Sequence, residues 1–407
     1  MALNIQQIRA DFPILQSKIN GKPLIYLDNA ATTQKPQSVI DAITRFYTTY
    51  NSNIHRGTHH LSNMATEAHE SARKTIQHYI NAAHEHEIIF TRGTTEGINL
   101  VAHSFGEAFV NPGDEVIVTE MDHHSNFVPW QRMCERRQAH FRVIPFKPNG
   151  DLQLDIYKKL LSERTRIVAF NHVSNSLGTI NNAKKIIDMA HDAGAAVLVD
   201  AAQSVQHIEH DVRDMDADFY VFSGHKIYGP TGIGVLYGKE EWLEAMPPYQ
   251  SGGEMIDLVS IEKTTYNKLP FKFEAGTPNI VGPIGLAAAF AYINALSFDD
   301  IVAHEDAVLE YGRDQLQQID GLKIFGNAKR RTSILAFNIE GIHHYDLGTL
   351  LDTRGVAVRT GHHCTQPIMT ALGIEGTVRA SLALYNTKED IDTLIEAIHA
   401  VLKILGR

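Results

Sequence analysis

The residues best suited to covalent chemistry lie in the segment Ser223-Gly-His-Lys226, which directly follows a short apolar strand predicted over residues 218–222. Gly229 and Gly232 come next and prevent a helix from forming there. A lysine held at a strand end among apolar residues loses its proton more easily, because burial disfavours the ammonium, and a neutral amine attacks carbonyl groups. A solvated lysine on a turn is the ordinary alternative, so this interpretation needs support from elsewhere in the chain.

That support comes from residues 197–204, Val-Leu-Val-Asp-Ala-Ala-Gln-Ser. An apolar strand there delivers Asp200 and Gln203 at its end. A carboxylate can pair with a pyridinium nitrogen, an amide can face a ring hydroxyl, and a lysine amine can bind an aldehyde. Together Lys226, Asp200 and Gln203 predict a site for pyridoxal phosphate (PLP).

Composition limits the class of protein. The chain has 407 residues, of which 43% are hydrophobic and 21% charged, as expected for a globular protein of two domains. A net charge of -10 argues against nucleic acid or an anionic membrane as the main partner. The longest apolar run, residues 282–296, is too short to span a bilayer and predicts a core helix. Cys134 and Cys364 cannot form a disulfide framework, and no signal peptide is recognisable, which together indicate a cytoplasmic protein.

Alternating strands and helices must position the reactive residues. The predicted strands that carry polar turns at their ends cover residues 87–90, 114–119, 166–170, 197–200 and 218–222. Helices between them imply a largely parallel sheet covered on both faces. In such a sheet the functional side chains gather at the carboxyl ends of the strands.

Two of these strand ends suggest further site residues. Thr94 and Thr95 precede an apolar helix predicted from Ile98, and this arrangement aims backbone N–H groups and hydroxyls at a phosphate. His123 follows the strand at residues 114–119, where it could stack on a flat cofactor or hold a proton for it. Each signal is weak alone, because threonines also cap ordinary helices and histidines often lie at the surface.

The regular alternation of strands and helices ends near residue 296, which predicts a smaller α+β domain after it. We therefore expect a large domain over residues 16–295 and a small domain made of residues 1–15 and 296–407. Cys364 lies in the small domain, after Arg359-Thr-Gly-His-His on a loop, in a cationic setting that favours the thiolate. The adjacent residues His362, His363 and Cys364 lack the spacing of zinc motifs, so no metal site is expected.

Several motifs occur together in a characteristic order: Leu27-Asp-Asn-Ala-Ala-Thr32, His55-Arg-Gly57, Arg92-Gly-Thr-Thr-Glu96, Glu120-Met-Asp-His-His124, Asp200-Ala-Ala-Gln203, Ser223-Gly-His-Lys226, Phe273-Glu-Ala-Gly-Thr277 and Arg359-Thr-Gly-His-His-Cys364. With them the chain resembles the class V aminotransferase group of fold-type I PLP enzymes. More narrowly it resembles group II cysteine desulfurases of the SufS type, since no longer loop is inserted before the last cysteine. The resemblance implies an α/β fold, with a mostly parallel seven-stranded sheet in the large domain.

The resemblance also implies roles for individual residues. Lys226 would hold PLP covalently and act as a base, Asp200 would pair with the ring nitrogen, and His123 would lie over the ring as an acid or proton carrier. The groups implied at the ring hydroxyl are Gln203 and, nearby, Asn175. The implied phosphate-binding residues are Thr94, Thr95, Ser223, His225 and, from a neighbouring subunit of a homodimer, Thr277. The implied substrate-binding residues are Arg379, Arg359, Asn175 and His55.

The activity implied by the resemblance is conversion of L-cysteine to L-alanine, with sulfur kept as a persulfide on Cys364. An acceptor protein of the SufE or SufU type would then take the sulfur for iron–sulfur cluster assembly. A selenocysteine lyase on the same scaffold fits every motif equally well. An aminotransferase or a kynureninase-like lyase fits less well, because neither needs a cysteine at position 364. A non-enzymatic binding protein is disfavoured by the intact set of Lys226, Asp200 and Gln203.

Overall fold

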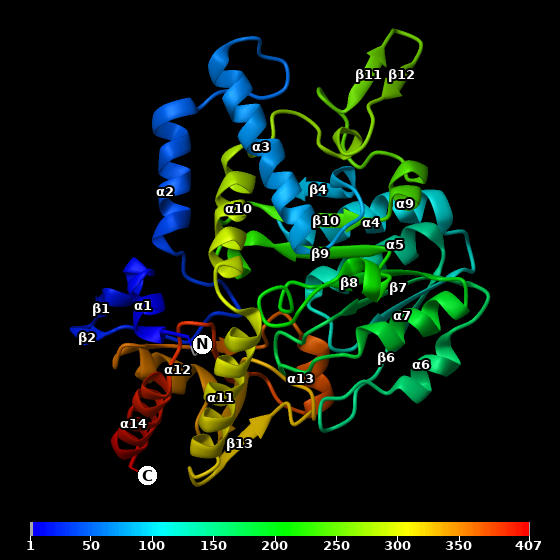
Figure 1. Ribbon diagram of the computed structural model, residues 1–407. Helices are drawn as coiled ribbons and strands as arrows, with labels where there is room; N and C mark the ends of the chain where they lie inside the picture. The colour runs from blue at the N-terminus through cyan, green and yellow to red at the C-terminus, as the bar shows by residue number, and fades with distance from the viewer. Residues whose placement is uncertain (1–2, 407) are drawn as a thin grey trace.

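The computed structural model describes residues 3–406 and is organised around a seven-stranded sheet (Figure 1). The strand order is β4-β10-β9-β8-β7-β5-β6. Its strands are β4 (Ile88–Thr91), β5 (Glu115–Thr119), β6 (His140–Ile144), β7 (Thr165–Asn171), β8 (Ala196–Asp200), β9 (Phe219–Ser223) and β10 (Gly234–Gly238). Neighbours from β6 to β9 are parallel, and β10 is antiparallel to both β9 and β4. The prediction of a mostly parallel seven-stranded sheet is therefore confirmed.

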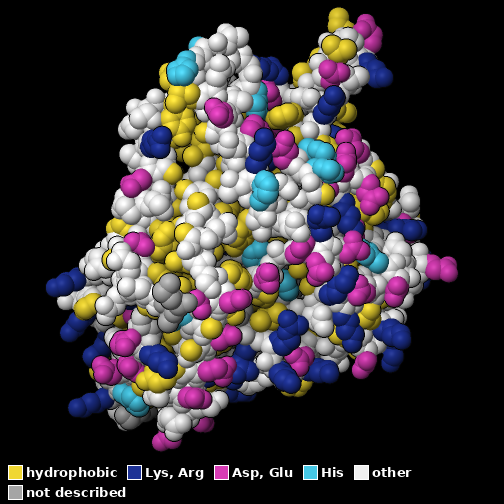
Figure 2. Space-filling model, in the orientation of Figure 1, with side chains coloured by type: hydrophobic (Ala, Val, Ile, Leu, Met, Phe, Trp, Pro, Cys, Tyr) yellow, Lys and Arg dark blue, Asp and Glu magenta, His cyan; other side chains and the backbone are white. Residues whose placement is uncertain are grey.

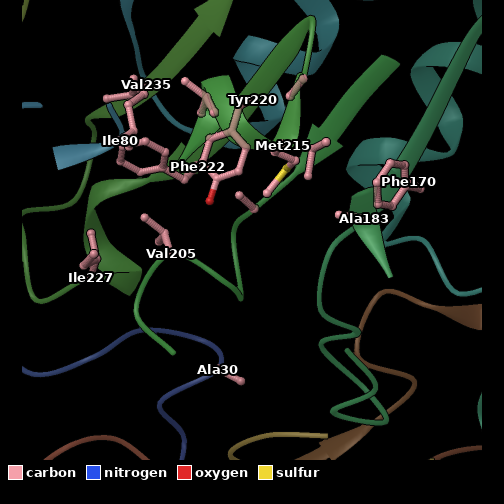
Figure 3. Close-up of a cluster of buried hydrophobic side chains, with 14 of the residues drawn as sticks. Ala30, Ile80, Phe170, Ala183, Val205, Met215, Tyr220, Phe222, Ile227 and Val235 are labelled. Carbon is pink, nitrogen blue, oxygen red and sulfur yellow. The ribbon is translucent and has the colours of Figure 1, made fainter. Parts of the chain in front are cut away.

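Both faces of this sheet are buried, because successive residues of its strands point to opposite sides. Tyr220 and Phe222 belong to one apolar cluster, shown in Figure 3, whereas Phe219 and Val221 belong to a second cluster on the other face. The helices associated with this sheet are α2 (Gln37–Arg45), α3 (His60–Tyr79), α4 (Thr94–Phe109), α5 (Val128–Arg137), α6 (Leu154–Leu160), α7 (Ala183–Asp192), α8 (Val212–Met215), α9 (Glu240–Ala245) and α10 (Val281–Asn294). Of these, α10 packs against both α2 and α3 (Figure 1).

Two helices differ from the sequence-based expectation. The 20-residue helix α3 was not predicted, because its buried face carries the polar residues His69 and Arg73 beside small and apolar ones. The helix expected from Ile98 begins four residues earlier, at Thr94. This earlier start places Thr94 in the first turn of α4, where backbone N–H groups have no partner within the helix.

A second, antiparallel sheet lies in the C-terminal part of the chain, with the strand order β13-β14-β17-β16. Its strands are β13 (Leu322–Phe325), β14 (Ile334–Ile339), β16 (Arg359–Gly361) and β17 (Thr377–Ser381). The helices of this part are α11 (Phe298–Leu316), α12 (His344–Asp352), α13 (Gln366–Leu372) and α14 (Lys388–Ile404). This combination of an antiparallel sheet and helices agrees with the α+β domain expected from the sequence. The domain boundaries after residues 15 and 295 stay predictions.

The N-terminal segment connects the two sheets. It contains α1 (Ile5–Ala10), the 3₁₀ turn Pro13–Gln16, and the short strands β1 (Lys18–Ile19), β2 (Lys22–Pro23) and β3 (Ile25–Tyr26). Strand β3 pairs in parallel with β15 (Val356–Ala357), which comes shortly before the Cys364 loop in sequence. The same N-terminal segment then passes beneath the end of β9, where Thr33 N donates to the His225 carbonyl at 3.0 Å.

A hairpin made of β11 (Ile256–Val259) and β12 (Thr264–Tyr266) projects from the body of the molecule (Figure 1). Within residues 3–406 no single helix is long and apolar enough to cross a membrane, although the sharply bent pair α10 and α11 together reaches that length.

Gly234 makes a testable contribution to this fold. A Cβ atom at Gly234 would lie 2.4 Å from Cα of Gly93, the residue that precedes α4 with φ near +154°. We expect Gly234→Ala to lower the free energy of unfolding by about 1–3 kcal/mol, because β10 and the turn before α4 must move apart. Urea unfolding would measure this loss. Gly253→Ala is the matched control, since nothing lies within 4 Å of its added Cβ. Equal midpoints for the two variants would contradict the expectation.

Candidate active site

A cavity of about 280 Å³ lies at the carboxyl edge of the main sheet and is closed on one side by the Cys364 loop. It brings together most of the residues singled out from the sequence: Thr94, Thr95, His123, Asn175, Asp200, Gln203, Ser223, His225, Lys226, Arg359, Cys364 and Arg379. His55 and Thr277 are not among its lining residues. The sheet contributes ends of β4, β5, β7, β8 and β9, as expected for a parallel α/β sheet.

Lys226 ends the 3₁₀ turn Gly224–Lys226 that follows β9, and its side chain faces the cavity. Burial lowers the pKa of Lys226 to about 8, and the Asp200 carboxylate opposes this shift. Its Nζ atom forms no hydrogen bond with any residue described between 3 and 406. The amine therefore has no partner to hold it, and its pKa lies closer to neutral pH than that of an exposed lysine.

Asp200 is the last residue of β8, and its side chain is buried at the bottom of the cavity. Burial raises the pKa of the Asp200 carboxyl, while a hydrogen bond from the Ala202 backbone N–H and the charge on Lys226 lower it. The N–H of Ala202 donates to Oδ1 at 2.9 Å. A carboxylate buried in this way is stabilised by any cation that enters the cavity.

Gln203 reaches the cavity from the turn after β8. Its Nε2 donates to the Ala30 carbonyl at 2.6 Å, which fixes the amide plane. Its Oε1 is buried and has no hydrogen-bond partner among the described residues. Because an unpaired buried polar atom costs free energy, this oxygen marks a position where a ligand donor belongs.

The first turn of α4 and the end of β9 together form an anion cradle. Ser223 Oγ accepts a hydrogen bond from Thr94 N at 2.8 Å and lies 2.7 Å from Thr94 Oγ1. The positive end of α4 therefore points at the cavity beside several hydroxyl groups. His225 also lines this end, and burial, followed by the charge on Lys226, lowers its pKa to about 4. The cradle thus offers neutral donors at neutral pH.

His123 lies directly after β5 and caps the short turn His124–Asn126. Its Nδ1 accepts from the Ser125 N–H at 3.1 Å, so Nδ1 carries no proton and the neutral ring has its proton on Nε2. Burial lowers the pKa of His123 to about 3, with a further contribution from Lys226. The imidazole is therefore neutral near pH 7 and presents Nε2–H as a donor.

The Cys364 loop is held in an uncommon backbone conformation. His363 and Cys364 have φ values of 52° and 58°, in the left-handed region that residues other than glycine rarely adopt. Contacts to the main-sheet loops hold this loop: His124 N donates to the Cys364 carbonyl at 2.8 Å, and Asn175 Nδ2 to the His363 carbonyl at 2.8 Å. Backbone strain held by surrounding contacts is common at functional sites.

Two arginines approach the cavity from the C-terminal sheet and share one carboxylate. Asp28 Oδ1 is 3.4 Å from Arg379, and its Oδ2 is 3.3 Å from Arg359. Arg379 is buried, donates to the Asn175 carbonyl at 2.8 Å, and has an Nε atom without a partner among residues 3–406. Burial lowers the pKa of Arg379 to about 10, although it stays charged at neutral pH. An unpaired guanidinium N–H on a buried cation is suited to binding a carboxylate.

Sequence reasoning assigned no role to several residues of this site. Asp28 stood within the recognised motif Leu27-Asp-Asn-Ala-Ala-Thr32, and that position was the available signal. His363 lines the cavity and bonds Thr377 Oγ1 through Nε2 at 2.8 Å. Within the described part of the chain, no three His, Cys, Asp or Glu side chains are placed to share a metal ion.

His55 and Thr277 lie outside the cavity of the single chain. His55 is placed between two carboxylates, with Nε2 2.9 Å from Glu70 and Nδ1 3.5 Å from Glu254. The hydrogen bond that His55 donates to the Glu70 carboxylate raises the pKa of His55, although burial opposes this. Thr277 is exposed and borders a separate pocket beside Arg92. Their predicted roles stay predictions.

With this geometry established, comparison with known proteins gives the family. The class-V aminotransferase family matches residues 25–394 of the 407. The chain belongs to the class-V aminotransferase family. A cysteine desulfurase of Escherichia coli is 49% identical over 407 residues, covering 100% of both chains. A cysteine desulfurase of Synechococcus elongatus is 51% identical over 98% of this chain, which spans 64% of the length of that relative.

Solved structures within the same fold agree closely with this class-V chain. The cysteine desulfurase CsdA from Escherichia coli, in an S-sulfonic acid form, superposes with a TM-score of 0.92 at 40% identity, covering 99% of this chain and 100% of that one. The apo cysteine desulfurase from Thermococcus onnurineus superposes with a TM-score of 0.93 at 38% identity, covering 99% of each chain. The fold is that of the fold-type I PLP transferases.

The residues of this class-V site fit PLP. The buried Asp200 carboxylate suits a pyridinium nitrogen, and the unpaired Oε1 of Gln203 suits the hydroxyl on the ring. The N-terminus of α4 with Ser223 suits the phosphate, and the Lys226 amine suits the aldehyde. The donor set as a whole matches the polar groups of this cofactor.

Burial of Lys226 has a consequence for stability in the cofactor-free protein. Below about pH 8 the amine is protonated in both states, so folding bears the full penalty of burying the charge. Between about 8 and its ordinary value of 10.5 only the unfolded chain holds the proton, so stability rises with pH. We expect Lys226→Met to be more stable than wild type near neutral pH, with a gain that shrinks above pH 8.

Urea midpoints of the cofactor-free proteins, measured on both sides of this pH window, would test the expectation. The exposed Lys184→Met is the control, and its difference from wild type should not change with pH. A gain for Lys226→Met that is independent of pH would contradict the assigned burial.

Proposed function

We propose that this class-V protein is a PLP-dependent cysteine desulfurase, which converts L-cysteine to L-alanine and passes the sulfur to an acceptor for iron–sulfur cluster assembly. The observation that carries the proposal is the position of Cys364, which lines the same cavity as Lys226 and Arg379. An aminotransferase needs no thiol at this place. Relatives about half identical over the full chain carry the name cysteine desulfurase, which supports the same activity.

Different side chains of the site are suited to substrate binding and to proton transfer. Arg379 and Asn175 would bind the substrate carboxylate, with the unpaired Nε of Arg379 as the available donor. When bound, PLP supplies an electron sink for the charge that develops at the substrate Cα. The Lys226 amine, with a pKa near 8, is suited to take the Cα proton. The neutral His123 is suited to donate a proton through Nε2.

Cys364 would perform the sulfur step. Its thiolate forms a bond to the substrate sulfur as the bond between that sulfur and the substrate Cβ breaks. The enzyme then carries a persulfide on Cys364, and a proton delivered to Cβ completes alanine. Cys364 is half-buried, so the persulfide can meet an acceptor thiol without unfolding of the loop.

The finer assignment is to the SufS type, with an acceptor of the SufE or SufU kind. Support for it comes from the short segment between Arg359 and Cys364, which forms β16 and one tight turn without an inserted loop. A cytoplasmic location is part of this proposal, because both cysteines are free thiols and a reducing compartment would keep them so.

Replacement of Cys364 tests the proposed function. Wild-type protein loaded with PLP and given L-cysteine and a reductant should release alanine and sulfide in equal amounts. Cys364→Ser should still bind PLP and cysteine, but its alanine formation should fall by roughly 10²-fold or more, since a serine hydroxyl is a far weaker nucleophile. Mass analysis of the wild-type peptide containing Cys364 should show one added sulfur.

Cys134→Ser is the matched control, because Cys134 is buried in α5 away from the cavity. It should keep wild-type turnover. Alanine produced by Cys364→Ser at the wild-type rate would reject the desulfurase activity in favour of a lyase that does not use this thiol.

We further propose that the active unit is a homodimer in which Thr277 completes the phosphate cradle of the partner and His55 borders its substrate. In the single chain both residues lie outside the cavity, which supports this arrangement. Figure 2 shows hydrophobic side chains gathered along α2 and beside α10, and large exposed ones in this region are Ile40, Tyr47, Leu61 and Met64. Apolar surface of this kind is suited to self-association.

Complementation between two inactive variants tests the shared site. Lys226→Ala and Thr277→Ala subunits, mixed and allowed to exchange, should form heterodimers with one site in which both residues are wild type. We expect activity to rise from nearly zero toward about a quarter of the wild-type value, because one site in two is restored in about half of the dimers. No rise in activity, after exchange has been verified with tagged subunits, would reject site sharing through Thr277.

A further inference from the structure

The carbonyl oxygen of His225, in the peptide that joins it to Lys226, accepts an unusual number of hydrogen bonds. Thr33 donates to this oxygen twice, from its N–H at 3.0 Å and from Oγ1 at 3.2 Å. Thr32 Oγ1 donates at 3.0 Å, and Lys35 Nζ donates at 3.0 Å. One carbonyl oxygen has two lone pairs and is ordinarily satisfied by one or two donors, so this convergence marks the peptide as tightly held.

None of these donors comes from the turn that carries Lys226. Within that turn the N–H groups of Ile227 and Gly229 both bond the Gly224 carbonyl instead. All the donors to the His225 carbonyl come from the distant segment 32–35, which crosses beneath the end of β9. Thr33 Oγ1 also accepts from Tyr228 N at 2.8 Å. The segment therefore holds the peptide before Lys226 and the peptide after Ile227.

Lys35 supplies the side-chain amine of this group. It is half-buried, its Nζ also donates to the Thr33 carbonyl, and it is not among the residues that line the cavity. No carboxylate pairs with it among residues 3–406, so backbone carbonyls alone accept the hydrogen bonds of this amine. Burial lowers the pKa of Lys35 to about 7, so near neutral pH the amine is present in both its charged and its neutral form, and it is an N–H donor in either. Its Nζ bonds two carbonyls at once, those of Thr33 and His225, whereas each threonine hydroxyl donates to the His225 carbonyl alone. Lys35 therefore contributes more to holding the peptide than either threonine hydroxyl.

The segment also connects this peptide to the side of the molecule that carries Cys364. The Tyr26 hydroxyl, in β3, donates to the Thr32 carbonyl at 2.8 Å. Strand β3 pairs with β15, and β15 leads through β16 to the Cys364 loop. The same backbone therefore contacts both the support of Cys364 and the support of Lys226.

We propose that Lys35 is a positioning residue for the reaction: its Nζ, with Thr32 and Thr33, clamps the His225–Lys226 peptide and so fixes the direction of the Lys226 amine relative to the Cys364 loop. This inference rests on the proposed function for its kinetic consequence, though not for the clamp itself. The clamp matters because the Lys226 side chain is long, forms no hydrogen bond of its own among residues 3–406, and depends on its backbone for direction.

Replacement of Lys35 tests the proposal. In Lys35→Met the apolar stem stays while the Nζ donor is lost. We expect kcat for alanine formation from L-cysteine to fall roughly tenfold, because a misplaced amine slows proton transfer, while KM stays within about twofold because the substrate contacts are untouched. The rate at which bound PLP is released into buffer, followed by its visible absorbance, should rise several-fold. Lys35→Arg should recover most of both quantities, since it restores a cation with N–H donors.

Lys272→Met is the matched control. Lys272 is also a buried lysine whose Nζ donates to two backbone carbonyls, those of Leu243 and Glu244 at 3.0 and 2.8 Å, but it lies away from the cavity. It should lower the thermal midpoint at least as much as Lys35→Met and leave kcat and PLP release unchanged. Thr32→Val removes a neutral donor from the same oxygen and should give a smaller change in the same direction; it carries the test if Lys35→Met does not fold.

Unchanged kcat and unchanged PLP release in Lys35→Met or Thr32→Val would overturn the clamp. Equal kinetic losses in Lys272→Met, or no recovery in Lys35→Arg, would also overturn it, because the effect would then be a general loss of stability. If wild-type protein forms no alanine, the proposed function fails, and the release rate of PLP still decides whether Lys35 holds the Lys226 peptide.

Discussion

Burial of a lysine amine without a hydrogen-bond partner among the described residues is the constraint on which the rest of the structure depends. An ammonium in such a place is unfavourable, and burial accordingly lowers the pKa of Lys226 to about 8. The strand that ends beside it and the turn that carries it must be rigid enough to keep the side chain from reaching solvent. The seven-stranded sheet provides that rigidity, because β9 is buried on both faces and paired on both edges.

The charges around the cavity are balanced so that an anionic substrate can enter. Arg379 and Arg359 share the single carboxylate of Asp28 at distances of 3.3–3.4 Å, which are long for ion pairs. The negative charge of Asp28 thus offsets the mutual repulsion of the two guanidinium groups without saturating their donors. His123 and His225 are neutral near pH 7 because burial lowers both pKa values, so they add donors without adding positive charge. The resulting site attracts a carboxylate and still permits a neutral amine at Lys226.

The two reactive groups come from different sheets, and their relative position depends on backbone contacts. Lys226 follows a strand of the main sheet, whereas Cys364 follows β16 in the C-terminal sheet. Asn175 and His124 from the main-sheet loops bond the backbone of the Cys364 loop, and the segment 32–35 bonds the backbone before Lys226. These contacts compensate for the left-handed backbone at Cys364 and for the lack of a partner at the Lys226 amine. Misalignment of either group would lengthen the path that sulfur and proton must cross.

The sequence by itself determined the alternation of strands and helices, and therefore which side chains lie at the carboxyl ends of β5, β7, β8 and β9. Asp200, Lys226 and His123 could be predicted because local strand patterns place them there. Cys364 could be predicted as a reactive thiol from its cationic neighbours, and the family resemblance added its role and Arg379. Helix α3 was missed, because its buried face holds Arg73, which pairs at 2.8 Å with Glu274, a residue 201 positions away.

Only the tertiary structure decided the contacts between distant segments. The pairing of Asp28 with Arg359 and Arg379, and the convergence of Thr32, Thr33 and Lys35 on His225, join residues separated by more than 150 positions. No local propensity encodes such contacts, since each residue type there is equally at home on a solvated surface. They arise when burial of the two sheets removes water, and the remaining polar groups must then find partners within the protein.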